Sequence, residues 1–115
     1  MSAPAIDRAT FDALQESTGA EFANELVDTF LEEAPVMFGE LDASLAAGDA
    51  TTFKRAAHSL KSNSLTFGAL ALGAMARELE LAGVANVIAG GGAPLAALAD
   101  EYARVAAVLL ELQRG

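Results

Sequence analysis

Hydrophobic positions recur at steps of three and four along most of the chain, which is the spacing of one face of an α-helix. Residues 20–47 carry seven apolar positions at such steps: Phe22, Leu26, Phe30, Ala34, Met37, Leu41 and Leu45. Residues 95–112 carry six more: Leu95, Leu98, Tyr102, Val105, Leu109 and Leu112. Each stripe predicts an amphipathic helix that buries one side and exposes the other.

Glycines and capping residues mark the other helices. A short helix is predicted over residues 7–17, with Phe11 and Leu14 facing inward, and Gly19 ends it. Another helix is predicted over residues 50–65. The Asp49 carboxylate can accept a hydrogen bond from a first-turn N–H of that helix, which favours a helix start at this point.

Three features interrupt the helical pattern. Pro35 lies inside residues 20–47, and because proline lacks an N–H and crowds the preceding turn, we expect a kink or a break there. Gly83 is the expected end of a helix over residues 69–82, and residues 86–93 are the expected loop before the last helix. The inward positions predicted for residues 69–82 are Leu72, Met75, Ala76 and Leu79.

These elements predict an all-α fold. Four helices with one apolar stripe each, joined mostly by short connections, are best buried as an antiparallel four-helix bundle, with the short N-terminal helix covering one end. Composition agrees, because alanine and leucine, which favour helices, greatly outnumber valine and isoleucine. A length of 115 residues is that of one domain, which we expect over residues 1–115.

Composition also excludes several function classes. The 16 acidic and 7 basic residues give a net charge of −9, which repels phosphates, so we expect no nucleic-acid and no anionic-membrane partner. A basic partner surface fits this charge better. Without cysteine there is no disulfide, zinc-thiolate site or thiol nucleophile, and one histidine is too few for most metalloenzyme and protease sites.

One uncharged stretch, residues 81–99, approaches the length of a membrane-spanning helix. Three glycines and a proline within residues 90–94 interrupt it, and Asn86 would lack a hydrogen-bond partner in lipid. Residues 1–11 contain no apolar segment of the signal-peptide type. We therefore expect no membrane association and a cytoplasmic location.

The single histidine, His58, lies within the predicted helix over residues 50–65. At about 100° per residue, the apolar positions of this helix cluster on one side. They are Phe53, Ala57, Leu60, Ser64 and Phe67. His58 lies roughly 140° from that direction, so the imidazole is expected to face solvent. Lys54 and Lys61 lie one turn before and one turn after it.

The basic residues are concentrated around this histidine. No acidic residue occurs between Asp49 and Glu78, so this window has a net charge of +4 while the rest of the chain has −13. Positive charge beside an exposed imidazole would stabilise a dianionic phosphoryl group attached to it. We therefore interpret His58 as a functional residue and not as an ordinary surface histidine.

The run of residues around His58 is also characteristic. Residues 57–64 read Ala-His-Ser-Leu-Lys-Ser-Asn-Ser, and Gly68-Ala69, Leu72, Met75-Ala76 and Leu79-Glu80 follow. This pattern resembles the signature of histidine-containing phosphotransfer (HPt) domains. The resemblance is close over the third and fourth predicted helices and looser over the second, where residues 30–35 read Phe-Leu-Glu-Glu-Ala-Pro.

The resemblance implies a phosphorelay function for a single HPt domain. His58 would accept a phosphoryl group from the aspartyl phosphate of one receiver domain and pass it to an aspartate of another. Lys61 would balance the phosphoryl charge, and Glu80 would orient the other imidazole nitrogen. Gly68 would permit the tight connection between the two helices.

The same resemblance implies partners and cofactors. The partners would be receiver domains of response regulators or a hybrid histidine kinase, and the bundle would be a monomer. It would have no kinase activity of its own, which agrees with the absence of a glycine-rich nucleotide-binding loop in the sequence. We expect no cofactor and no metal site in this chain. Mg²⁺ is expected on the receiver partner.

Four residues near His58 are candidates for partner binding. Lys54 and Arg55 are predicted docking cations, and Leu65 is a candidate apolar anchor. HPt domains usually have glycine directly after the motif lysine, where the receiver loop comes close, and here that position is Ser62. Its hydroxyl could hydrogen-bond the phosphoryl oxygens or alter partner preference.

Three rival functions can be compared with the sequence. A di-iron bundle needs a Glu-x-x-His pair on each of two helices, which one histidine excludes. An acyl carrier protein needs a serine directly after an aspartate at a helix start, and the sequence offers none. The remaining alternative is an HPt-like docking or scaffold bundle that binds receiver domains or kinases without being phosphorylated.

Overall fold

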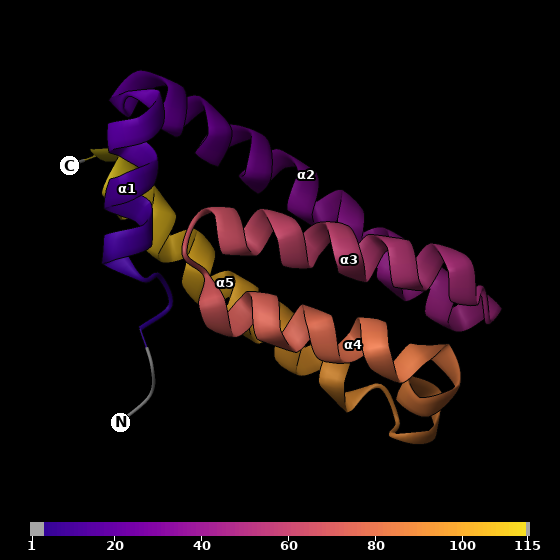
Figure 1. Cartoon of the computed structure of the whole chain (residues 1–115). Helices are drawn as coiled ribbons and strands as arrows, with labels where there is room; N and C mark the ends of the chain where they lie inside the picture. The colour runs from indigo at the N-terminus through magenta and orange to yellow at the C-terminus, as the bar shows by residue number, and fades with distance from the viewer. Residues whose placement is uncertain (1–3, 115) are drawn as a thin grey trace.

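The computed structural model describes residues 4–114 and is entirely α-helical in this part of the chain (Figure 1). The helices in chain order are α1 (Arg8–Thr18), α2 (Ala20–Ala47), α3 (Ala50–Thr66), α4 (Leu70–Ala89) and α5 (Ala93–Arg114). Helices α2 to α5 run alternately up and down beside one another, and α1 crosses one end of them (Figure 1). The predicted all-α bundle with a short N-terminal helix at one end is confirmed.

Helix α1 begins and ends close to the predicted positions. The Asp7 carboxylate accepts a hydrogen bond from the Thr10 N–H at 3.1 Å and so caps the first turn. Gly19 ends the helix with a φ of +89°, a backbone conformation that glycine adopts without strain. Phe11 is fully buried, which fixes α1 across the bundle.

The inward stripe of α2 differs from the prediction at its N-terminal end. Phe22, predicted to be buried, is 51% exposed, and Ala23 and Val27 face the core instead. The predicted set contains too many steps of four, so over its length it drifts by about 140° around a helix of 3.6 residues per turn. The observed stripe alternates steps of four and three and consists of Ala23, Val27, Phe30, Ala34, Met37, Leu41 and Ser44.

The expected break at Pro35 does not occur. Helix α2 continues through Pro35 as one element of 28 residues. Pro35 itself is exposed, whereas Ala34 and Met37 beside it are buried against the core. Packing of the adjacent turns therefore holds the helix together across the position where proline removes one hydrogen bond.

Gly83 interrupts α4 without ending it. Its φ of +79° and ψ of 168° lie outside the helical region, as expected for a stop, but the chain returns to helix at once. Val84 and Val87 are buried after this kink, and their burial favours the second helical segment. The predicted loop over residues 86–93 is therefore wrong, since only a short glycine turn at residues 90–92 separates α4 from α5.

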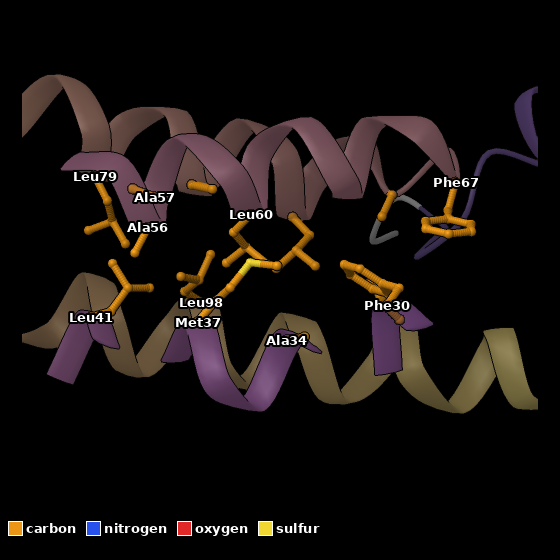
Figure 2. Packing of buried hydrophobic residues seen from close by; sticks show 14 of the residues in the cluster. Phe30, Ala34, Met37, Leu41, Ala56, Ala57, Leu60, Phe67, Leu79 and Leu98 are labelled. Atoms are coloured by element: carbon orange, nitrogen blue, oxygen red, sulfur yellow. The ribbon is translucent and has the colours of Figure 1, made fainter. Parts of the chain in front are cut away.

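The core lies between two pairs of helices, with α3 and α4 on one side and α2 and α5 on the other (Figure 2). The predicted inward side of α3 is confirmed, because Phe53, Ala57, Leu60, Ser64 and Phe67 are all buried. Phe30 of α2 packs against Phe67, with ring centroids 5.2 Å apart. In the described part of the chain, no helix is long and apolar enough to cross a membrane.

Candidate functional site

His58 lies on the solvent side of α3. Its side chain is 57% exposed, while the adjacent Ala57 and the nearby Leu60 are fully buried. The burial of one face of α3 therefore turns the imidazole outward. The direction predicted from the helical periodicity is confirmed.

A carboxylate from the neighbouring helix holds one side of the imidazole. Nδ1 of His58 lies 2.9 Å from Oε2 of Glu80 on α4. An ionised carboxylate only accepts hydrogen bonds, so Nδ1 carries the hydrogen in this pair. In the neutral ring Nε2 is then unprotonated, and its lone pair is free to act as a nucleophile.

Glu80 also contacts the motif lysine. Nζ of Lys61 lies 3.4 Å from Oε1 of Glu80, so the two oxygens of one carboxylate serve two residues that are one turn apart on α3. Burial alone would raise the pKa of Glu80, but the hydrogen bond with His58 and the positive charge of Lys61 outweigh it. The pKa of Glu80 is therefore below its ordinary value, and the carboxylate is ionised at neutral pH.

Close packing of α3 on α4 brings these groups together. A Cβ added to the buried Gly73 of α4 would lie 2.7 Å from Cδ2 of Leu65 on α3, so the two helices approach closely there. Two turns away, His58 faces Glu80 across the same antiparallel pair. The contact at Gly73 and the pair at His58 thus define one register of α3 against α4.

The connection between α3 and α4 depends on Gly68. Its φ is +82°, and a Cβ there would lie 2.7 Å from the carbonyl oxygen of Asp7. The Asp7 N–H donates a hydrogen bond of 2.7 Å to the Gly68 carbonyl. Glycine is therefore needed both for the backbone turn and for the close approach of the chain before α1.

Comparison with known proteins decides what kind of domain this is. The family model described as the Hpt domain matches residues 25–113, which include His58, Lys61 and Glu80. The chain belongs to the Hpt domain family. It is accordingly a member of the histidine phosphotransfer proteins of phosphorelay signalling.

A solved Hpt structure has the same fold. The chain is similar to histidine-containing phosphotransfer protein B (HptB) from Pseudomonas aeruginosa PAO1, with 29% sequence identity and a TM-score of 0.89. The similarity covers 98% of this chain and 97% of that chain. Comparison with curated proteins gave no match.

The other predicted residues of this Hpt domain lie around the same face of α3. Lys54, Arg55 and Ser62 are exposed on α3, and Leu65, near its C-terminal end, is 43% exposed. Leu65 thus both covers Gly73 and presents apolar surface to solvent. Within residues 4–113, whose side chains the structure describes, no group of three or more His, Cys, Asp or Glu residues is arranged to hold a metal ion.

Sequence reasoning missed two parts of the site. The pattern around His58 gave Lys61 and Glu80 separate roles, whereas the structure joins them in one ion pair. The signal was the spacing of His58 and Lys61, which lie one turn apart on the same helix. A carboxylate that reaches His58 therefore also comes near Lys61. Gly73 was not identified as a packing residue, since a glycine inside a helix gives no sign of which neighbour lies against it.

Proposed function

We propose that this Hpt domain carries a phosphoryl group on Nε2 of His58 and passes it between aspartates of receiver domains. The observation that supports this most directly is the half-exposed imidazole with Nδ1 bonded to Glu80 at 2.9 Å. In the neutral ring, that arrangement leaves the opposite nitrogen, Nε2, with a free lone pair on a half-exposed side chain. A larger partner can reach it without any rearrangement of α3 or α4.

The transfer requires no proton movement at the attacking nitrogen. The lone pair of Nε2 forms a bond to phosphorus as the bond between phosphorus and the aspartate oxygen breaks, and the aspartate leaves as a carboxylate. Nδ1 keeps its hydrogen, so the phosphorylated ring is cationic. The ionised Glu80 offsets that charge through the hydrogen bond it already accepts.

Lys61 supplies the complementary charge on the other side. It lies one turn after His58 on α3 and is held near the imidazole by Glu80 at 3.4 Å. An ammonium group in this place can attract the phosphoryl oxygens when they arrive. We assign Lys61 to balancing phosphoryl charge and Glu80 to orienting the imidazole.

Receiver domains are the proposed partners. The exposed positions Lys54, Arg55, Ser62 and Leu65 surround His58 on α3 and would contact the receiver around the point of transfer. We expect any Mg²⁺ in the reaction to be bound by the receiver. The chain itself is proposed to act as a phosphocarrier with no kinase activity of its own.

Phosphotransfer from labelled receivers tests the proposal. The protein is incubated with a panel of receiver domains carrying radiolabelled aspartyl phosphate, beside the variant His58→Gln. Label should pass to the wild-type protein, should not pass to the variant, and should be labile in acid and stable in base. If no receiver labels the wild type, or if the variant is labelled as well, the assignment is wrong and the docking or scaffold function takes its place.

A further inference from the structure

A groove of about 710 Å³ lies between α2 and α5, on a side of the bundle to which α3 contributes no lining residue. Helix α2 lines this α2–α5 groove from Pro35 to Leu45, which is about 15 Å along the helix axis. Helix α5 lines it from Leu95 to Tyr102. No residue of the His58 site belongs to the groove, so a molecule bound in it would leave the imidazole accessible.

The floor of the α2–α5 groove is apolar and is held in place by the core. The rings of Phe38 on α2 and Tyr102 on α5 both line it, and their centroids are 5.3 Å apart. Tyr102 also packs against the buried Phe30, with ring centroids 6.0 Å apart. Because the core fixes these rings, the groove is formed before a partner arrives, and binding requires little ordering of its side chains.

Several of the residues that line this groove are small. They include Gly39, Gly92, Ala96 and Ala99. A Cβ added at Gly39 or Gly92 would meet no atom within 4 Å, so the space above the backbone is open there. The distance at which two helices pack depends on the side chains at their contact, and short ones allow a close approach. The groove can therefore accept a whole helix.

The apolar surface continues beyond the turn between α4 and α5. A further hollow of about 420 Å³ shares Asp42, Leu45 and Gly92 with the groove and extends to Ile88, which is 53% exposed. An amphipathic helix binds a groove through apolar residues at i, i+3 or i+4, and i+7. The two hollows together provide apolar surface for such a row of residues.

The polar groups of the α2–α5 groove favour a basic partner. Asp42 lines both hollows, is exposed, and forms no ion pair within the described part of the chain. The 28 residues of α2 include seven acids and no lysine or arginine. Burial raises the pKa of Tyr102, so its hydroxyl stays protonated at neutral pH and can both donate and accept a hydrogen bond. Lysine or arginine side chains would complement this surface.

We infer that the α2–α5 groove binds an amphipathic helix of another protein, with its apolar face on Phe38 and Tyr102 and its lysine or arginine residues beside Asp42. This inference goes beyond the proposed function and does not depend on it. A second copy of this chain fits the groove less well, because its net charge of −9 has the same sign as the groove. A protein held at the groove leaves the outer face of α3 uncovered.

Binding of a model peptide tests the inference. The probe is a synthetic amphipathic peptide of leucine and lysine, about 18 residues or five helical turns long, with one tryptophan on its apolar face. The protein contains no tryptophan, so the fluorescence of the peptide reports binding without a background signal. One control peptide has the same residues in a scrambled order without an apolar face. The other keeps the apolar face and has glutamate in place of lysine.

Two matched pairs of variants separate the groove from the general negative charge. Asp42→Lys reverses a charge inside the groove, and Glu25→Lys makes the same change on α2 outside it. Ala99→Phe narrows the groove, and Ala107→Phe adds the same ring to α5 outside it. All four side chains are exposed, so the fold should persist, which thermal unfolding of each variant checks.

The lysine peptide should bind the wild-type protein and shift the amide NMR signals of Gly39, Gly92 and Ala96. Asp42→Lys and Ala99→Phe should each raise its dissociation constant about tenfold at low salt, while Glu25→Lys and Ala107→Phe should change it less than threefold or so. The scrambled peptide and the glutamate peptide should both bind about tenfold more weakly than the lysine peptide, or less tightly still.

The inference is overturned if the lysine peptide does not bind, or if it binds no better than the scrambled peptide. Equal effects of the variants inside and outside the groove would overturn it as well, and so would NMR shifts confined to other faces of the bundle. Dimerisation of the wild type that Ala99→Phe abolishes, measured by analytical ultracentrifugation, would assign the groove to a second copy of the chain instead. None of these results bears on the proposed function, which the labelling of His58 tests separately.

Discussion

Glu80 connects the two residues of α3 that carry the proposed chemistry. It accepts the Nδ1 hydrogen of His58 and pairs with Lys61, and it is mostly buried while His58 is mostly exposed. A carboxylate held in this way fixes both the tautomer and the direction of the ring. Its contribution should therefore be measurable in the rate of transfer.

Replacement of this carboxylate is the first prediction. Glu80→Ala should slow phosphotransfer to His58 by about tenfold or more, because the ring loses a charge-assisted hydrogen bond and the cationic product loses its counter-charge. Glu80→Gln, which keeps an oxygen acceptor, should be slowed less. Glu78→Ala, at an exposed acid two residues earlier on α4, is the control. Equal rates for Glu80→Ala and Glu78→Ala would contradict the role of Glu80.

A second prediction concerns pH. The folded protein lowers the pKa of Glu80, so the ionised carboxylate stabilises the fold. That contribution to stability is complete above the pKa of glutamate in the unfolded chain, about 4.3. It is lost as the pH falls through the lower pKa that Glu80 has in the folded protein. The urea midpoint of the wild type should exceed that of Glu80→Gln at pH 7, and the difference should disappear in acid. A difference that is independent of pH would contradict this linkage.

Only part of the site could be predicted from local sequence. His58 could be predicted because the helical periodicity of residues 50–65 places it on the solvent side and because it lies within the window that contains no acidic residue. Glu80 lies 22 positions away on another helix, and family resemblance, not periodicity, gave its role. The packing of Leu65 on Gly73 could not be foreseen, since it depends on the register between two helices.

At the scale of the elements, two glycines with positive φ should respond differently to alanine. Gly48 ends α2 with open space around it, so Gly48→Ala should cost about 1–2 kcal/mol of unfolding free energy for the left-handed backbone alone. Gly68→Ala should cost more, because its Cβ would also meet the backbone oxygen of Asp7 at 2.7 Å. Urea unfolding measures both, and equal losses would argue against the close approach at Gly68.

The kink in α4 gives a further prediction. Gly83 has φ +79° and ψ 168°, a region for glycine only, so Gly83→Ala should lower the unfolding free energy by roughly 1–3 kcal/mol. Gly39 lies in the regular part of α2 with open space around it, and Gly39→Ala should raise that free energy by about 0.5–1 kcal/mol. Thermal or urea unfolding should therefore show a lower unfolding free energy for Gly83→Ala and a higher one for Gly39→Ala. A rise in unfolding free energy for both variants would contradict the non-helical backbone at Gly83.

The elements themselves were predicted well, and their details less well. Helix starts follow from local chemistry, as at Asp7 and Asp49, where a carboxylate caps the first turn. The continuation of α2 through Pro35 and of α4 through Gly83 depends on burial of the turns that follow, which is tertiary information. The exposed Phe22 shows the same limit, because two stripes at helical spacing compete and only the packed bundle selects one.

At the scale of the whole molecule, the net charge of −9 conceals an ordered distribution. Basic residues gather on the outer side of α3 around His58, while Glu32, Glu33 and Glu40 of α2 line a groove between α2 and α3. The helices that carry these two surfaces are fixed side by side by the core between them (Figures 1 and 2). The two charged surfaces are therefore held in a fixed relative position.

The central claim is that Nε2 of His58 carries the phosphoryl group while Nδ1 keeps its hydrogen. The protein has one histidine, so a ¹⁵N-histidine-labelled sample gives the signals of one imidazole. After incubation with a phosphorylated receiver, NMR should show ³¹P coupling at Nε2 and a protonated Nδ1, with the Nδ1 signal altered in Glu80→Ala. Coupling at Nδ1, or an unchanged imidazole in a protein that has taken up phosphate, would contradict the account.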